Sequence, residues 1–146
     1  GDFTYSNEEF ELMKQDIVKF KEMGCKGIVS GILHDDKTID IERTKQLVEL
    51  SRPLDFTFHR AFDMVTDPLK ELEKLIQLGV DRILTSGQKQ KAVKGIELLK
   101  ELKKNAKDKI IIMPGSGINK SNIMNFKSFN EIHGSFKDEI NTNILL

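Results

Sequence analysis

The chain has 146 residues, of which 38% are hydrophobic and 32% are charged, a composition typical of a single soluble globular domain. Lys plus Arg and Asp plus Glu both number 23, so the formal net charge is zero and no long-range field draws the protein to nucleic acid or to an anionic membrane. The single cysteine, Cys25, excludes an internal disulfide framework and favours a reducing compartment, so we expect a cytoplasmic protein.

The sequence carries no sign of a membrane segment. No apolar run approaches the roughly 20 residues that a membrane-spanning helix needs. The first five residues lack the basic and then apolar pattern of a signal peptide. The chain begins with Gly1 rather than methionine, and we therefore expect it to have been cut or processed. Neither a membrane nor a nucleic acid is expected among its partners.

The hydrophobic pattern switches repeatedly between a helical period and short apolar runs. Three helices have clear starts, because Ser6, Asp40 and Asp67 are N-cap residue types placed ahead of amphipathic stretches. The predicted helices run from Ser6 to Gly24, from Asp40 to just before Pro53, from Asp67 to Gly79, over 89–104 and over 120–126. The predicted strands cover residues 27–33, 54–59, 82–85, 110–113 and 130–133.

Five strands that alternate with helices, at intervals of roughly 21 to 30 residues, predict an α/β fold with parallel strands. A (β/α) barrel and a doubly wound sheet both fit this pattern. Each strand ends in polar or glycine-rich sequence. Because the carboxyl ends of parallel strands lie on one face, these ends are expected to converge on one mouth. That mouth is the predicted functional site.

The clearest candidate site is the run FTFHRAFD, residues 56–63, in which a buried strand ends at three polar side chains. Strand alternation places His59 opposite the two strand phenylalanines, pointing into a barrel. Arg60 then points outward, where it either holds an anionic group or pairs with a loop acid. Asp63 belongs to the pocket or caps a short turn. For His59 the alternative is a buried histidine satisfied by neighbouring backbone.

Several multi-residue segments together resemble the CutC family of copper homeostasis proteins, in family order over nearly the whole chain. They are residues 1–6 (GDFTYS), 58–64 (FHRAFDM), 82–88 (RILTSGQ), 115–118 (GSGI) and 131–133 (EIH). The resemblance implies a TIM (β/α)8 barrel with a polar pocket at its carboxyl face. It also implies that this chain carries about five of the eight β/α units, from the loop after the third strand to the end of the eighth. We therefore expect one partial barrel domain over residues 1–146.

The resemblance extends the candidate site. It brings His133 to the same pocket as His59. It also makes the turn Gly115-Ser116-Gly117, with Gly134 and Ser135, a candidate phosphate cradle of backbone amides. An ordinary turn between strand and helix is the alternative for those glycines. The family strands without a counterpart here are expected to carry further pocket residues, including cysteines proposed in some members as copper ligands.

Two functions from different classes remain open. The resemblance implies a cytosolic copper homeostasis protein that binds copper, with His59 and His133 as candidate ligands; imidazoles suit Cu(II) or Zn, whereas Cu(I) prefers thiolates. The residues also suit an enzyme acting on a small anionic or phosphorylated metabolite, with either histidine as general acid or base and Arg60 on the anion. Five strands cannot close an eight-strand barrel, so we expect a homo-oligomer, or else an unstable fragment without a competent site.

Overall fold

The computed structural model describes residues 2–135. Gly1 of the first motif and residues 136–146 of the predicted domain lie outside the described residues. Within them, helices and strands alternate as expected for an α/β protein. In chain order the elements are α1 (Asn7–Glu22), β1 (Gly27–Ser30), α2 (Ile41–Ser51), β2 (Asp55–Phe58), the 3-10 helix η1 (Arg60–Met64), α3 (Pro68–Gln77), β3 (Arg82–Thr85), η2 (Ala92–Lys94), α4 (Ile96–Ala106), β4 (Ile111–Pro114) and η3 (Ile123–Phe126).

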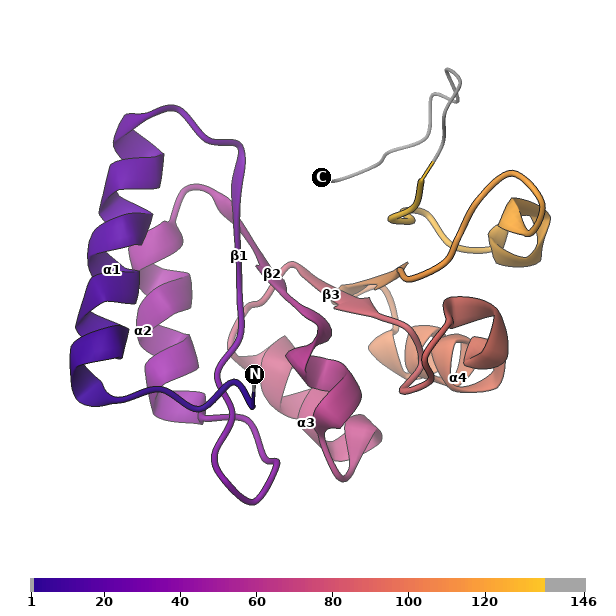
Figure 1. Cartoon of the computed structure of the whole chain (residues 1–146), viewed down its shortest axis with the longest axis horizontal. Coiled ribbons are helices and arrows are strands. Elements are labelled where there is room, and N and C mark those ends of the chain that lie inside the picture. The colour runs from indigo at the N-terminus through magenta and orange to yellow at the C-terminus, as the bar shows by residue number, and fades with distance from the viewer. Residues whose placement is uncertain (1, 136–146) are drawn as a thin grey trace.

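The strands form one parallel sheet in the order β1-β2-β3-β4, so neighbours in the sequence are neighbours in the sheet. Helix α1 packs beside α2, and α3 packs beside α4, as the chain winds along the curved sheet (Figure 1). A doubly wound sheet would reverse its strand order at a switch point, which does not happen in residues 2–135. The structure therefore confirms consecutive units of a partial (β/α) barrel.

The predicted caps begin the helices where the sequence indicates. At α1 the Glu9 N–H donates to Ser6 Oγ at 3.1 Å, and the Ser6 N–H donates to Glu9 Oε1 at 2.8 Å, which completes a capping box. Asp40 and Asp67 accept in the same way from N–H groups in the first turns of α2 and α3. Each cap satisfies a donor that the helix itself leaves unpaired. All three predicted starts are confirmed.

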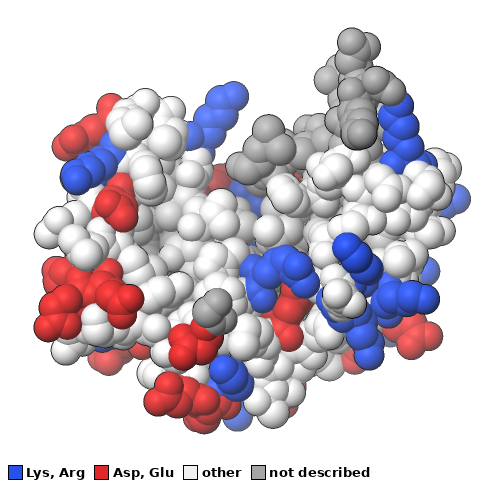
Figure 2. Space-filling view, viewed as in Figure 1, with Lys and Arg blue, Asp and Glu red and all other residues white. Residues whose placement is uncertain are grey.

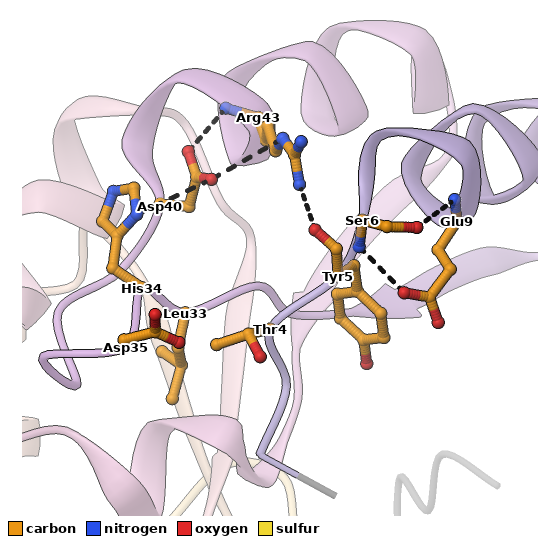
Figure 3. Close-up of a pocket in the computed structure, with 9 residues that line it drawn as sticks. All are labelled: Thr4, Tyr5, Ser6, Glu9, Leu33, His34, Asp35, Asp40 and Arg43. Carbon is orange, nitrogen blue, oxygen red and sulfur yellow. Dashed lines mark hydrogen bonds and ion pairs between the residues drawn. The ribbon is translucent and has the colours of Figure 1, made fainter.

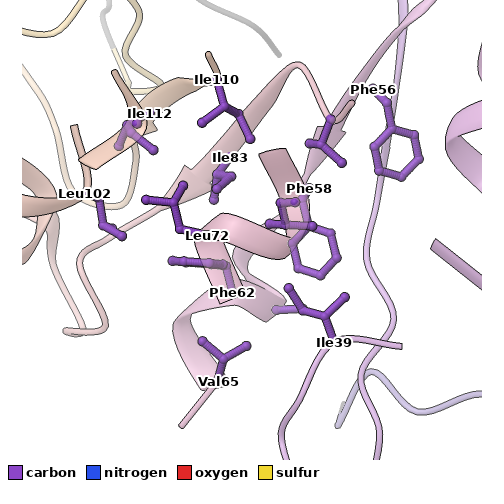
Figure 4. Packing of buried hydrophobic residues seen from close by; sticks show 14 of the residues in the cluster. Ile39, Phe56, Phe58, Phe62, Val65, Leu72, Ile83, Leu102, Ile110 and Ile112 are labelled. Atoms are coloured by element: carbon purple, nitrogen blue, oxygen red, sulfur yellow. The ribbon is translucent and has the colours of Figure 1, made fainter. Parts of the chain in front are cut away.

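The hydrophobic core lies between the sheet and the helices. Phe56 and Phe58 of β2 and Ile83 of β3 are fully buried, and they pack in one cluster with Phe62 of η1 and Leu72 of α3 (Figure 4). Burying a side chain of this size stabilises the fold by roughly 2 kcal/mol. These residues mark the helix-facing side of the sheet, as the sequence predicts for the two phenylalanines.

The fifth predicted strand, residues 130–133, is reduced to a single parallel bridge between Gly115 and His133. This segment runs beside the very end of β4, and no described strand pairs with its other side. A segment that pairs on one side only, and only at the end of its neighbour, forms few of the hydrogen bonds of a strand ladder. The segment is still anchored, because Phe129 and Ile132 are buried in the core.

Two predicted helices also differ from the structure. In the stretch 89–104, α4 begins only after η2. The reason is that the backbones of Gly87, which has φ 71°, and Gly95 pack directly against each other. A Cβ on Gly87 would lie only 2.2 Å from the Gly95 carbonyl oxygen. In the stretch 120–126 only the 3-10 helix η3 forms. There the Asn119 side chain accepts from a backbone N–H two residues on, a local turn that competes with helical hydrogen bonds.

A buried charge network lies at the amino-terminal end of the sheet. Arg82, at the start of β3, is 9% exposed and donates to Glu131 Oε1 at 2.9 Å and Oε2 at 3.2 Å, and to Asp55 Oδ2 at 3.2 Å. Burial opposes the guanidinium charge, but the hydrogen bonds and charge of Glu131, with those of Asp55, outweigh it and raise the pKa of Arg82. This bidentate pair reaches across β4 and holds the segment that carries Glu131 against the sheet.

Candidate functional site

The sheet register places His59 on the face turned away from the helices, which we call the inner face. Asp55 and Thr57 lie on the same face of the sheet as Arg82, since Thr57 pairs in register with Arg82 and Asp55 contacts it. Because side chains alternate along a strand, His59, two residues after Thr57, lies on this face too. Gly31, just after β1, lies beside the imidazole. A Cβ on Gly31 would lie 2.8 Å from both Nδ1 and Cε1 of His59. The ring therefore occupies space that only a glycine leaves open.

His133 lies on the same inner face. Glu131, two residues earlier, reaches Arg82 on that face, and alternation puts His133 on the side of Glu131. His133 is bridged to Gly115, and a Cβ on Gly115 would lie 2.5 Å from Leu84 Cδ1. His59 thus follows the carboxyl end of β2, and His133 lies at the parallel bridge just beyond the carboxyl end of β4. They are three strand positions apart, which corresponds to about 14 Å along the sheet.

The His59 ring is held by its neighbours. Its backbone N–H donates to Ser30 O at 3.1 Å, which continues the ladder between β1 and β2. Its Nδ1 accepts from the Ala61 N–H at 3.2 Å and caps η1. The Phe3 ring lies 4.8 Å away, centroid to centroid, in a tilted arrangement. Burial lowers the pKa of His59 below its ordinary value, so the imidazole is neutral at pH 7.

Arg60 and Asp63 form an ion pair within η1. Arg60 Nε donates to Asp63 Oδ2 at 2.7 Å, and Arg60 Nη2 donates to Ser86 Oγ at 2.9 Å. The Arg60 side chain is 41% exposed, whereas that of Asp63 is 10% exposed. Among residues 2–135, Arg60 Nη1 has no hydrogen-bond partner. The guanidinium is therefore fixed in orientation and keeps one edge open to solvent.

Asp63 anchors the loop that follows β3. Its Oδ1 accepts from Thr85 Oγ1 at 2.5 Å and from the N–H groups of Ser86, at 3.1 Å, and Gln88, at 3.2 Å. With Arg60 on Oδ2, this carboxylate has little acceptor capacity left for a ligand. Of the two alternatives for Asp63, the hydrogen bonds favour the structural one. The sequence gives no signal for Gln88, whose role depends on a carboxylate 25 residues earlier.

The predicted phosphate cradle is partly occupied by the protein itself. The N–H groups of Gly115 and Ser135 each donate to a backbone carbonyl at 3.0 Å, and the Ser116 hydroxyl donates to another at 2.8 Å. The N–H groups of Ser116, Gly117 and Gly134 differ, because no acceptor within residues 2–135 takes them. Those three amides are the part of the predicted cradle that is still available to an anion.

A surface hollow of about 570 Å³ lies at the rim between the starts of α1 and α2 (Figure 3). The sequence does not predict it. Arg43 and Asp40 of the hollow are already engaged: Arg43 donates to Tyr5 O at 2.8 Å, and Asp40 Oδ2 lies 3.8 Å from Arg43 Nε and 3.9 Å from His34 Nδ1. Neither candidate histidine lines it. The lining residues are Thr4, Tyr5, Ser6, Glu9, Leu33, His34, Asp35, Asp40 and Arg43.

The described residues do not by themselves form a copper site. In residues 2–135 no group of three or more His, Cys, Asp and Glu side chains is placed to hold a metal ion. The lone pair on Nδ1 of His59 is taken by the Ala61 N–H, and His133 is three strand positions away. Copper bound here would need ligands from outside these residues.

The fold and the site together define a parallel β/α barrel protein whose polar groups gather at the carboxyl ends of the strands. The CutC family matches residues 1–138, and the chain belongs to this family.

Curated relatives and a solved structure show the same likeness. The human copper homeostasis protein cutC homolog is 49% identical over 123 residues, which are 84% of this chain and 45% of that protein. The family protein CutC of Photorhabdus laumondii is 48% identical over 92% of this chain and 55% of its own length. The crystal structure of the putative copper homeostasis protein CutC from Streptococcus agalactiae superposes with a TM-score of 0.88, at 30% identity, over 94% of this chain and 69% of that one. The chain thus spans about half the length of the curated relatives it matches.

Proposed function

We propose that this chain forms the anion-binding part of a small-molecule site at the carboxyl ends of β2 and β3. The barrel to which it belongs would act on a small anionic or phosphorylated metabolite. The observation that carries this proposal is Arg60, whose guanidinium is fixed by Asp63 and Ser86, whose Nη1 has no hydrogen-bond partner among residues 2–135, and whose side chain is 41% exposed. An arginine held in this way binds a carboxylate or phosphate without losing much side-chain freedom.

Neighbouring groups support an anion at this mouth. His59 directly precedes Arg60, and the N–H groups of Gly117 and Gly134 are available near the end of β4. Within the proposed enzyme, His133 is the group we assign to proton transfer, because it shares the inner face and its imidazole is half-buried. The chemistry of such a site is acid–base catalysis on a substrate that Arg60 holds.

Calorimetric titration with inorganic phosphate tests the proposal. Arg60→Met should weaken phosphate binding at least tenfold, because it removes a charge-assisted contact. Arg43→Met is the matched control, since this arginine lies in the hollow of Figure 3 and should leave phosphate binding unchanged. Equal effects of the two variants, or no binding by the parent chain, would refute the Arg60 site.

Copper binding in the cytosol is the second candidate function, and the copper homeostasis names of the relatives favour it. Under this alternative, His59 and His133 are the candidate ligands, and copper bound at either histidine needs further ligands from outside residues 2–135, because the two lie three strand positions apart. If copper is the ligand, His59→Ala and His133→Ala should each weaken the binding of Cu(I) or Cu(II) strongly, since each removes one of few ligands. Titrations with Cu(I), Cu(II) and Zn(II) on both variants, beside phosphate, separate the two functions.

We also propose that the chain self-associates through β1, one of the two edge strands of the described sheet. Val29 on this strand is 55% exposed, and Phe20 of α1 beside it is 44% exposed. Figure 2 shows few charged residues between the acidic left side of the molecule and the blue group near its centre, where β1 lies in Figure 1, which leaves little to repel a partner strand. Within residues 2–135 no helix is long and apolar enough to cross a membrane.

A further inference from the structure

The hydrogen bond to His59 determines which of its ring nitrogens carries the proton. The Ala61 N–H donates to Nδ1 at 3.2 Å, and a nitrogen accepts a hydrogen bond only through a free lone pair. A neutral imidazole has one N–H, so the hydrogen must reside on Nε2. The bond lies within the start of η1, so the backbone itself selects this tautomer.

Packing keeps the ring in this orientation. Gly31 faces the Nδ1 and Cε1 atoms so closely that a Cβ at this position would lie 2.8 Å from both. The rings of Phe3 and Phe58 lie 4.8 and 6.1 Å from the imidazole, centroid to centroid. A turn of the ring would break the Ala61 bond and press other ring atoms against these neighbours. The tautomer is thus a property of the fold.

Nε2, in contrast, is unpartnered. No hydrogen-bond acceptor among residues 2–135 takes its hydrogen, and the atom is not among those sealed from solvent. It therefore presents a single N–H at the carboxyl end of β2, in the residue that precedes Arg60. Because Nδ1 accepts from the Ala61 N–H, it carries no proton, so the ring offers the hydrogen on Nε2 without a positive charge; burial lowers the pKa of His59 and acts in the same direction.

We propose that His59 is a fixed neutral hydrogen-bond donor whose Nε2–H contacts an acceptor oxygen of the ligand, and that it is neither a general base nor a copper ligand. This inference rests on the proposed anion site. It specifies the ligand further: the ligand must carry a phosphate, carboxylate or carbonyl oxygen that Nε2 of His59 can reach, in addition to the oxygen that Arg60 binds. Copper on Nε2 would require the proton on Nδ1, where it would face the Ala61 N–H.

Nitrogen-15 NMR of the full chain tests the tautomer directly. The chain has only three histidines, His34, His59 and His133, so the imidazole signals can be assigned by single substitutions. His59 should show the Nε2–H tautomer alone, and His34, which is exposed and lies 3.9 Å from Asp40 Oδ2, serves as the control. One equivalent of Zn(II) or Cu(I), both diamagnetic, should leave the His59 signals unchanged. A protonated Nδ1 in the neutral ring, or metal-induced loss of the Nε2–H signal, would overturn the proposal.

Substitutions at Gly31 and His59 test the ring position and the ligand contact separately. Gly31→Ala should displace the ring and abolish the single-tautomer spectrum. Gly24→Ala is the control: it strains the backbone, because φ is 80° there, but its Cβ meets nothing within 4 Å, so the His59 spectrum should stay unchanged. His59→Leu should weaken binding of inorganic phosphate about tenfold. If phosphate binds to the parent chain but neither shifts the Nε2 signal nor responds to His59→Leu, the donor role is wrong although the anion site stands. If phosphate does not bind at all, the proposed function fails, and the ligand contact fails with it.

Discussion

Two charge networks lie at opposite ends of the same sheet, and they are built differently. At the amino-terminal end, Arg82 is bound by Glu131 and Asp55, and its guanidinium is almost fully buried. At the carboxyl end, Arg60 is bound by Asp63 but is 41% exposed and has one nitrogen without a partner among residues 2–135. We call the Arg82 network closed, because the guanidinium is buried against its acidic partners. We call the Arg60 network open, because one guanidinium nitrogen has no partner among residues 2–135.

This difference separates stability from function within one short sheet. Breaking a buried ion pair leaves an uncompensated charge, so the Arg82 network should affect mainly folding. An anchored but half-exposed arginine has capacity for a ligand, so the Arg60 network should affect mainly binding. The division matches the general rule that parallel barrels place their sites at the carboxyl ends of strands and use the opposite end for stability.

The largest expected effect is on the closed network. Glu131→Gln should lower the free energy of unfolding by about 3 kcal/mol, because Arg82 would remain buried without its charged partner. Asp55→Asn is the matched control: this second partner is 55% exposed, and its loss should cost less than about 1 kcal/mol. Urea denaturation measures both variants. Equal losses would show that the network is not closed in the way described.

The next largest effect is expected at Asp63, which binds Arg60 in the open network. Asp63→Asn should cost about 2 kcal/mol and loosen the loop after β3, since the carboxylate organises that loop. Hydrogen exchange should quicken at the N–H groups of Ser86 and Gln88. Asp35→Asn, at an exposed loop position, should change stability by less than about 0.5 kcal/mol. Unchanged exchange in Asp63→Asn would mean that another group holds the loop.

A smaller effect is expected at the sheet edge. Val29→Lys should weaken self-association about tenfold, because a charge on the inner face of β1 opposes a partner strand. Val93→Lys is the control, at a partly exposed valine in η2. Analytical ultracentrifugation over a concentration series gives the association constants. A parent chain that stays monomeric and unfolds cooperatively would contradict the edge proposal.

The smallest effect concerns pH. Because the folded-state pKa of His59 lies below its ordinary value of 6.5, the unfolded chain binds more protons as the pH falls below 6.5. Stability from this group is therefore complete above pH 6.5 and is lost as the pH falls through the folded-state pKa. His59→Gln should remove this part of the acid dependence, and His34→Gln, an exposed control, should keep it. Urea titrations at several pH values compare the three proteins.

Local signals account for what could be predicted from the sequence. The caps at Ser6, Asp40 and Asp67 act within three residues, so the helix starts were predictable, and the apolar runs located the strands. The weak fifth strand was not predictable, because its pairing depends on what covers its other side. The role of Asp63 depends on Thr85, which is 22 residues later, and no local pattern reports such a contact.

The candidate site was only partly predictable from the sequence. The sequence indicated that His59, Arg60 and His133 would reach one end of the sheet. The register and the bridge place the two histidines at that end, and a shared site of the three residues stays a prediction. It did not indicate that Gly31 makes room for the imidazole or that Ala61 selects its tautomer. Both depend on the close approach of neighbouring backbone, which appears only when the strands are paired.

A chemical-shift map of the full chain titrated with inorganic phosphate tests most directly whether the open network around Arg60 binds an anion. An anion held at the open network should shift the signals of His59 Nε2–H, the Arg60 side chain and the Ser86 amide together, with one dissociation constant. The signals of Arg43 and His34 in the hollow of Figure 3 should stay in place. Shifts confined to that hollow, or none at either place, would contradict the account.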